Sequence, residues 1–202
     1  MITIVDYGAG NLRSIARAFA AIGVDAQVVD TPEQVERAEA VVLPGVGAAG
    51  AAMRYLKERG LDEAVRGALR RGLPFLGVCL GMQLLLGSHE EGDVAGLSLL
   101  PGRVRRFPEG LLVPQMGWNQ VRLLRETQLF DGVPEGAHFY FVHSYYAEPE
   151  DAGQVVGQTE YGPSYCSVIE AGNLWGVQFH PEKSGANGLQ VLRNFAKVAG
   201  QC

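Results

Sequence analysis

The stretch Pro74–Leu86 reads PFLGVCLGMQLLL, with a cysteine between two close glycines and an apolar run on either side. The first run has the composition of a buried strand, and in the second the apolar residues recur at a spacing that suits a helix. The stretch therefore predicts a strand, a sharp turn and a helix. A nucleophile elbow crowds the positions two before and two after its reactive residue, so Gly77 and Gly81 make Cys79 a candidate nucleophile.

Two interpretations of Cys79 remain open on this stretch alone. A sulfur on such a turn lies at a helix N-terminus, where the dipole and free N–H groups favour the thiolate that attacks a carbonyl carbon. A lone buried cysteine more often packs as a small apolar residue. The two flanking glycines are a weak signal by themselves, so the choice depends on the rest of the chain.

Outward from this stretch, the first half of the chain alternates apolar runs with helical patterns. We expect buried strands at residues 2–5, 24–29, 40–43 and 74–78. One helix is expected from the end of the loop at residues 6–11 to about Ile22, another after Thr31 as a cap with Pro32 at the first helical position, and further helical segments up to Arg71. This alternation predicts an α/β fold whose mostly parallel central sheet has helices on both faces.

The second half has a different texture. Strand patterns without intervening helices cover residues 103–107, 113–123, 139–147, 154–160 and 165–170, which predicts an antiparallel patch. A last strand is expected over Leu174–Phe179 and a closing helix over residues 187–198. Because nothing resembles a long linker, residues 1–202 are expected to form a single domain.

Composition excludes several classes of protein. The 202-residue chain has 22 acidic and 17 basic residues, and its arginine pairs are short and isolated, which argues against nucleic acid as a partner. The apolar run at Met1–Asp6 is too short for a signal peptide, and no run approaches membrane-spanning length. We therefore expect a cytoplasmic protein that is not bound to a membrane.

The cysteines and histidines predict no metal or cofactor. The three cysteines, Cys79, Cys166 and Cys202, are too few and too far apart for a disulfide framework or a zinc site. His89, His138 and His143 lack metal-ligand spacing, and surface or core positions are expected for them. The sequence does not indicate roles for Cys166 and Cys202.

A second chemical signal follows the last predicted strand, at His180-Pro181-Glu182. The residue before a proline is held extended, and side chains two apart in extended chain project to the same side. Glu182 can therefore orient the His180 imidazole. Cys79 and His180 both follow strands, and functional groups of open α/β sheets gather at the carboxyl ends of strands. A nucleophile, a base and an orienting carboxylate favour an active thiol over an inert one.

Acyl transfer also requires N–H donors for the oxyanion. The N–H of Leu80, directly after the nucleophile, is one candidate. The loop after the neighbouring strand, with Gly45, Val46 and Gly47 following Pro44, is the other, although an ordinary strand-to-helix turn explains this loop somewhat better when it is taken alone. Rotation of the peptide between Gly45 and Val46 would exchange a carbonyl for an N–H in this hole, which predicts a switch.

The chain resembles the class I (triad) glutamine amidotransferases, which have a flavodoxin-like core, and within them the glutaminase subunits of imidazole glycerol phosphate synthase. Residues 77–83 (GVCLGMQ) and 179–182 (FHPE) match the class. The subfamily resemblance covers nearly the whole chain and is carried by residues 4–11 (IVDYGAGN), 43–47 (LPGVG), 116–119 (MGWN), 140–145 (YFVHSY) and 182–185 (EKSG). One departure is Ala49, where the subfamily usually has a phenylalanine.

The resemblance implies a specific chemistry and specific binding residues. Cys79 would attack the carboxamide of glutamine to give a γ-glutamyl thioester and ammonia, with His180, oriented by Glu182, as acid and then base. Gln83, Ser144 and Tyr145 match positions that hold the amino-acid end of glutamine in this class.

The resemblance also implies a partner. Ammonia would pass to a (β/α)₈-barrel synthase subunit, which makes imidazole glycerol phosphate and an aminoimidazole carboxamide ribotide in histidine biosynthesis. The surface facing that subunit would include Asn11, Met116, Trp118, Tyr140 and Lys183. Trp118 would be an interface anchor, although a tryptophan in this pattern could also belong to the core.

Three alternatives stay open on the sequence. Residues 6–11 (DYGAGN) after a first strand suggest a nucleotide site, but the full G-x-G-x-x-G pattern is absent. The same glutaminase chemistry could serve another synthase, against which residues 116–119 argue. The chain could also be a flavodoxin-like binding module with an inert Cys79.

Overall fold

The computed structural model describes residues 1–8 and 10–201, so Ala9 and Cys202, both noted in the sequence, lie outside the described residues. The helices are α1 (Leu12–Ala21), α2 (Pro32–Glu36), α3 (Ala49–Glu58), α4 (Leu61–Arg70), α5 (Leu80–Gln83), α6 (Gly185–Val198) and the 3₁₀ turns η1 (Gln128–Phe130), η2 (Ala152–Gln154) and η3 (Pro181–Lys183). The strands are β1 (Ile2–Val5), β2 (Ala26–Val29), β3 (Ala40–Leu43), β4 (Phe75–Val78), β5 (Ser88–His89), β6 (Val94–Ala95), β7 (Gly102–Arg106), β8 (Gln115–Gln120), β9 (Arg122–Leu123), β10 (His138–His143), β11 (Tyr145–Pro149), β12 (Val155–Glu160), β13 (Ser164–Ala171) and β14 (Leu174–Val177).

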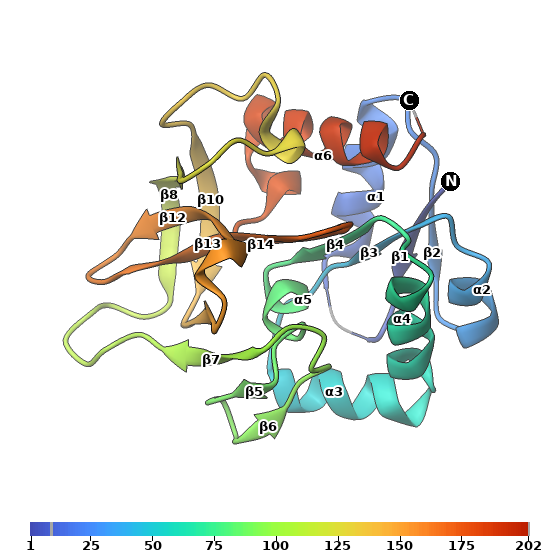
Figure 1. Ribbon diagram of the computed structural model, residues 1–202, viewed down its shortest axis with the longest axis horizontal. Coiled ribbons are helices and arrows are strands. Elements are labelled where there is room, and N and C mark those ends of the chain that lie inside the picture. Colours follow the sequence, from blue (N-terminus) through green and yellow to red (C-terminus); the bar gives the residue numbers. More distant parts are fainter. Residues whose placement is uncertain (9, 202) are drawn as a thin grey trace.

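The main sheet begins with five parallel strands in the order β2-β1-β3-β4-β14. Beyond β14 it continues through β13, β11 and β7, of which β13 is antiparallel to β14 and β7 is antiparallel to β11 (Figure 1). The predicted α/β fold with an antiparallel region in the second half is therefore confirmed. No helix among the described residues is long and apolar enough to cross a membrane.

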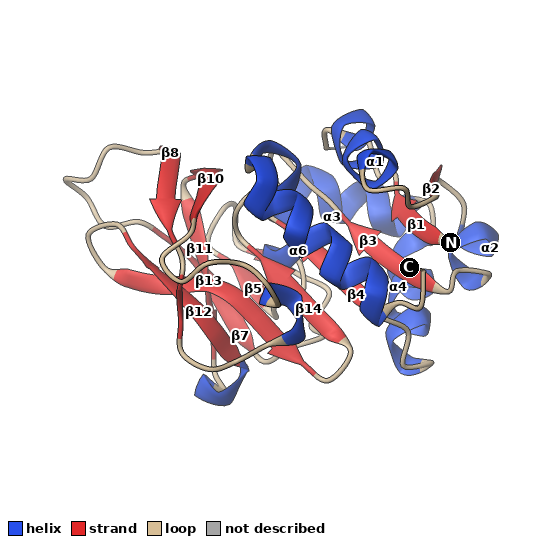
Figure 2. Cartoon of the chain, turned by 90° about the horizontal axis from the view of Figure 1, so that it is seen from above, coloured by secondary structure: helices blue, strands red, loops and turns tan. Residues whose placement is uncertain are grey.

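Four of the five parallel strands are buried along their whole length because helices cover both faces of the sheet, whereas the edge strand β2 is partly exposed. Every residue of β1, β3, β4 and β14 is buried. One apolar cluster joins one face to α1 and α6, and a second joins the other face to α2, α3 and α4 (Figure 2). Continuous apolar runs, rather than alternating ones, are what a doubly covered sheet requires.

The predicted single strand over residues 139–147 is wrong. The chain breaks at Ser144 into β10, which pairs with β8 in a separate two-stranded sheet, and β11, which belongs to the main sheet. Buried and partly exposed residues alternate along β10, because only one of its faces packs on the core. The break leaves Ser144 and the first residue of β11 at the boundary between the two sheets.

Two local expectations also differ from the structure. The helix after Cys79 ends at Gln83. The next carbonyls, of Leu84 and Leu85, accept hydrogen bonds from the N–H groups of Leu97 and Leu99 at 2.7 and 2.8 Å instead of continuing the helix. Thr31 precedes α2 as expected, but its side chain makes no capping bond. Its hydroxyl donates instead to Gln34 Oε1 at 3.0 Å.

Candidate active site

Cys79 occupies the turn between β4 and α5 and is the N-terminal cap residue of α5. Its φ of +53° is unusual for a residue with a side chain, as expected of a strained elbow. A Cβ on Gly81 would overlap the Leu43 carbonyl oxygen, and one on Gly77 would lie 2.9 Å from the Gly81 carbonyl oxygen. The structure thus confirms that the turn leaves no room for larger side chains at these two positions.

His180 follows β14 in extended conformation, with φ −99° and ψ +98°. Its N–H donates to the Tyr140 carbonyl at 2.9 Å, and its own carbonyl accepts from Ser184 Oγ at 2.7 Å. Its Nδ1 lies 2.9 Å from Glu182 Oε1, so the expected contact is present. Glu182 does not continue an extended chain, however, because Pro181 starts the turn η3.

The ring of His180 is buried and is held at one nitrogen only. Its Nε2 has no hydrogen-bond partner, so that nitrogen is free for proton transfer. Burial alone would lower the pKa of His180, but attraction to the Cys79 sulfur and the interaction with Glu182 outweigh burial and raise this pKa above its ordinary value. The raised pKa favours a charged imidazole beside the sulfur.

The Leu80 N–H, a predicted oxyanion donor, is bound to the Gly45 carbonyl oxygen at 3.4 Å. In this conformation a carbonyl of the loop therefore occupies the expected hole. Gly45 is tightly enclosed: a Cβ there would overlap the Tyr7 hydroxyl, which is buried without a hydrogen-bond partner. Val46 is 38% exposed, and a Cβ on Gly47 would meet nothing within 4 Å.

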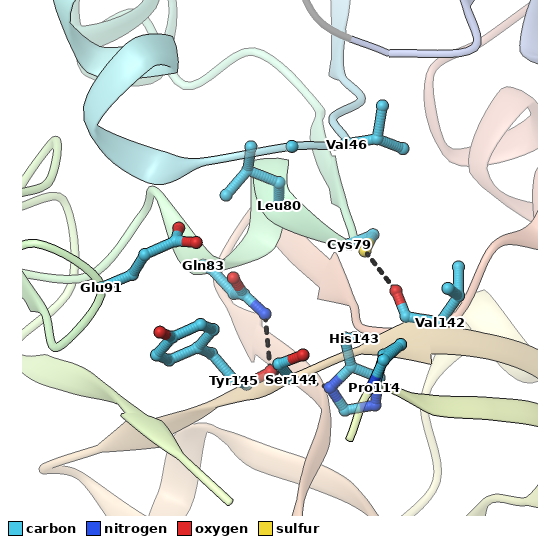
Figure 3. Close-up of a pocket in the computed structure, with 11 residues that line it drawn as sticks. Val46, Cys79, Leu80, Gln83, Glu91, Pro114, Val142, His143, Ser144 and Tyr145 are labelled. Atoms are coloured by element: carbon cyan, nitrogen blue, oxygen red, sulfur yellow. Dashed lines mark hydrogen bonds between the residues drawn. The ribbon is translucent and has the colours of Figure 1, made fainter. Parts of the chain in front are cut away.

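A cavity of about 300 Å³ opens beside the sulfur (Figure 3). It is lined by residues of the elbow, the loop after β3 and the break between β10 and β11: Val46, Gly47, Cys79, Leu80, Gln83, Glu91, Pro114, Val142, His143, Ser144 and Tyr145. The volume is at the small end of the range for ligand pockets, which suits a metabolite of amino-acid size.

Gln83, Ser144 and Tyr145 all line this cavity, as their predicted role requires. Both the nitrogen and the oxygen of the Gln83 side-chain amide are already hydrogen-bonded within the protein, however. Its Nε2 donates to the Tyr145 carbonyl at 2.8 Å and to Gln178 Oε1 at 3.0 Å, and its Oε1 lies 3.1 Å from His89 Nε2.

Four of the five predicted interface residues lie near one another. Met116 and Trp118 are 65% and 57% exposed on β8, so the alternative that Trp118 belongs to the core is wrong. The Trp118 ring meets the Tyr140 ring edge-on at 6.2 Å, and Lys183 Nζ lies 5.7 Å from the Tyr140 ring centre. Asn11 is exposed at the start of α1, which packs against η3.

A sequence model described as glutamine amidotransferase class-I matches residues 3–199. The chain belongs to that family. It is 52% identical over 198 residues, 98% of this chain and 94% of the relative, to an imidazole glycerol phosphate synthase subunit HisH of Moorella thermoacetica. The subunit HisH of Methanothermobacter thermautotrophicus is 54% identical over 199 residues, 98% of each chain.

Solved structures of glutamine amidotransferases share the fold. One described as a glutamine amidotransferase has a TM-score of 0.78 at 21% identity and covers 99% of this chain and 100% of its own. The structure of PurLQS from Thermotoga maritima has a TM-score of 0.78 at 19% identity, with 98% and 97% covered. At these identities the likeness concerns the amidotransferase fold alone.

The sequence did not point to two residues of this amidotransferase pocket, Glu91 and Pro114. Glu91 follows another glutamate in a polar turn, and that pattern is typical of a solvated loop. Its carboxylate instead accepts from the Ala49 N–H, at the start of α3, at 2.8 Å. An acidic side chain at a largely apolar pocket is a signal that only the structure provides.

Proposed function

We propose that this chain is the glutaminase subunit of an imidazole glycerol phosphate synthase, which hydrolyses glutamine and delivers ammonia to a (β/α)₈-barrel partner. The observation that carries the proposal is the juxtaposition of an elbow cysteine with a carboxylate-bound histidine at the ends of neighbouring strands β4 and β14. Full-length identity of about half to relatives named as this subunit supports the choice of pathway.

In the proposed reaction the Cys79 sulfur attacks the carboxamide carbon of glutamine, and the C–N bond breaks. His180 Nε2 gives its proton to the departing nitrogen, so that ammonia leaves and a γ-glutamyl thioester remains. Water, deprotonated by the same nitrogen, then attacks the thioester and releases glutamate and the thiol. Glu182 holds the ring through Nδ1 and favours its charged form.

The oxyanion of each step needs donors that the observed loop conformation withholds. We propose that rotating the Gly45–Val46 peptide removes the Gly45 carbonyl from the Leu80 N–H and turns N–H groups of Val46 or Gly47 inward. Loss of a single donor from such a hole costs roughly 10²–10³ in turnover. One peptide rotation is therefore large enough to serve as the switch between the resting and the active enzyme.

The two ends of glutamine would be recognised by different sides of the cavity. Ser144 and Tyr145, at the break between β10 and β11, supply polar groups for the amino-acid end. We propose that the Glu91 carboxylate balances the positive charge of the ammonium group of glutamine, because a charged ligand in a small pocket needs an opposite charge. Gln83 supports this arrangement by holding the Tyr145 carbonyl.

We propose that the barrel subunit docks on Met116, Trp118, Tyr140, Lys183 and Asn11, at the edge where the triad opens. Tyr140 connects this surface to the chemistry, because its carbonyl accepts from the His180 N–H. Residues 1–202 would act as a single domain in the cytoplasm, without a metal or cofactor.

The test is glutamate release by the chain alone, with the barrel subunit, and with that subunit carrying its nucleotide ligand. We expect a large rate increase in the last case, and Cys79→Ala should abolish it while ammonia-dependent synthesis by the complex persists. Near-normal glutamate release by Cys79→Ala would contradict the assignment of the nucleophile. Equal rates in all three conditions would contradict the loop switch.

A further inference from the structure

A line of buried polar side chains leads from β5 to the Cys79 sulfur. His89 is 3% exposed, Gln83 is 5% exposed and Gln178 is fully buried. The imidazole Nε2 of His89 lies 3.1 Å from Gln83 Oε1, Gln83 Nε2 lies 3.0 Å from Gln178 Oε1, and Gln178 Nε2 lies 3.7 Å from Cys79 Sγ. Neither His89 nor Gln178 has a role in the proposed reaction so far.

Two backbone groups determine the direction of every hydrogen bond in this line. The Glu91 N–H can only donate, and it meets His89 Nδ1 at 3.0 Å, so the ring proton must be on Nε2 and must point to Gln83 Oε1. The Tyr145 carbonyl can only accept, and it independently requires the nitrogen of the Gln83 amide on its side. The oxygen of Gln178 therefore faces Gln83, and its N–H groups face the sulfur.

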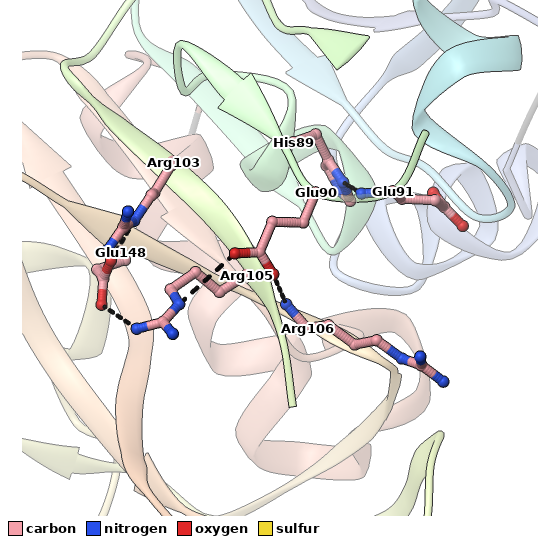
Figure 4. Close-up of polar contacts among 7 residues, drawn as sticks. All are labelled: His89, Glu90, Glu91, Arg103, Arg105, Arg106 and Glu148. Atoms are coloured by element: carbon pink, nitrogen blue, oxygen red, sulfur yellow. Dashed lines mark hydrogen bonds and ion pairs between the residues drawn. The ribbon is translucent and has the colours of Figure 1, made fainter. Parts of the chain in front are cut away.

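His89 is well placed to impose this direction because its segment is firmly anchored (Figure 4). Strand β5 pairs with β7, and the carboxylate of the next residue, Glu90, accepts from the Arg106 N–H at 2.8 Å and lies 3.7 Å from Arg105 Nε. Burial lowers the pKa of His89, against the opposite effects of Glu91 and Glu90, which keeps the ring neutral with a single proton.

We infer that His89 is a positioning residue for the nucleophile: through Gln83 it fixes the Gln178 amide so that its N–H donates to the Cys79 sulfur. A hydrogen bond to the charged form of an ionisable group favours that form, so this donor stabilises the thiolate. The inference rests on the proposed function, in which that thiolate attacks glutamine. Gln178 then acts directly on the reacting atom.

Residues 89–91 also contact parts of the site other than the nucleophile. The Glu91 carboxylate accepts from the N–H of Ala49, two residues after the oxyanion loop, and the His89 ring lies 5.0 Å from the Tyr145 ring. Residues 89–91 therefore contact segments that lead to the nucleophile, the oxyanion loop and the proposed glutamine site. Because His89 also accepts from the Glu91 N–H, the test measures the reactivity of the nucleophile directly and not glutamine turnover alone.

The test is the rate at which iodoacetamide alkylates Cys79 at one fixed neutral pH, with the modified peptide identified by mass. His89→Phe keeps an aromatic ring beside Tyr145 but removes the Nε2 donor to Gln83, and we expect alkylation to fall about tenfold, because the released Gln178 amide no longer donates to the charged sulfur. The kcat for glutamine should fall by a similar factor with little change in KM.

Three further variants make the result decisive. His89→Gln, which keeps an N–H at the Nε2 position, should restore most of the alkylation rate. Gln178→Met, which keeps the side-chain length without any donor, should lower that rate at least as much as His89→Phe. His138→Phe is the matched control, because His138 is exposed at the start of β10, and it should leave the rate unchanged.

Unchanged alkylation in a folded His89→Phe or Gln178→Met protein would overturn the inference, as would a loss of kcat without any loss of alkylation. Alkylation does not involve glutamine hydrolysis. A changed alkylation rate in a chain that releases no glutamate with its partner would therefore contradict the proposed function and leave the role of His89 intact.

Discussion

The Cys79 elbow and the loop Gly45–Gly47 face the same cavity, but the chain holds them by different means. The elbow lies between buried strands, and its flanking glycines leave no space for a methyl group. In the loop Gly45 is enclosed, Val46 is 38% exposed, and a Cβ added to Gly47 would meet nothing within 4 Å. Packing therefore fixes both glycines of the elbow but leaves the loop free at Gly47.

The proposed catalysis needs a rigidly placed nucleophile and a movable switch, and the difference in packing suits the elbow to the first role and the loop to the second. A nucleophile must stay within a few tenths of an ångström of its working position, which favours a site on rigid elements. A switch needs a segment with two arrangements of similar free energy, which favours a loop with few buried contacts. In the proposed switch, rotation of the peptide after Gly45 would move neither Cys79 nor His180, because neither residue belongs to that loop.

The largest effect is expected from Gly81→Ala in the elbow. The new Cβ would overlap the Leu43 carbonyl oxygen and approach the carbonyl carbon to 2.7 Å, so backbone of β3 would have to move. We expect a loss of about 4 kcal/mol or more in the free energy of unfolding, measured in urea.

The matched control for this variant is Gly47→Ala in the loop. Nothing obstructs its Cβ, and only the φ of +95° opposes it, so a loss of about 1 kcal/mol is expected. Equal losses at the two glycines would contradict the contrast between a fixed elbow and a free loop.

A second prediction concerns His143, on the fixed side of the cavity. Burial lowers the pKa of His143 to about 4, while the hydrogen bond of its Nδ1 to the Tyr145 carbonyl at 2.7 Å acts in the opposite direction. As the pH falls from about 6.5 the unfolded chain gains a proton that the folded protein does not take up until about pH 4. Over that window this residue should cost the folded protein about 3 kcal/mol of stability.

His143→Gln tests this sign directly. Unfolding free energies measured at several pH values should fall less steeply for this variant than for the wild type as the pH decreases from about 6.5 to 4. His138→Gln, at an exposed histidine, is the matched control. Parallel curves for His143→Gln and the wild type would show that the cavity wall admits the charged imidazole.

The smallest effect on stability is expected from Trp118→Ala, at the surface where we propose that the barrel subunit docks. The side chain is 57% exposed, so stability should change by at most about 0.5 kcal/mol. As a buried anchor of the complex it should contribute about 2 kcal/mol to the affinity for the barrel subunit, measured by calorimetry. An unchanged dissociation constant would remove Trp118 from the centre of the interface.

The sequence predicted the elements that depend on local pattern. The buried strands β1, β3 and β4 lie where continuous apolar runs placed them, and the elbow was predictable because only glycine fits on either side of Cys79. The contact between His180 and Glu182 was likewise predicted from their spacing, although Pro181 turns the chain where an extended one was expected.

Tertiary structure alone decided the rest, because it depends on contacts between distant segments. The apolar run over residues 139–147 divides between two sheets, and no local property of Ser144 marks the break that brings it to the cavity. His89 ends the short strand β5, and Glu91 lies in the polar turn after it. Only the pairing of β5 with β7 brings these two residues to Gln83 and Ala49. A hydrogen bond between residues so far apart in the chain has no periodic pattern in sequence, and only packing brings its donor and acceptor together.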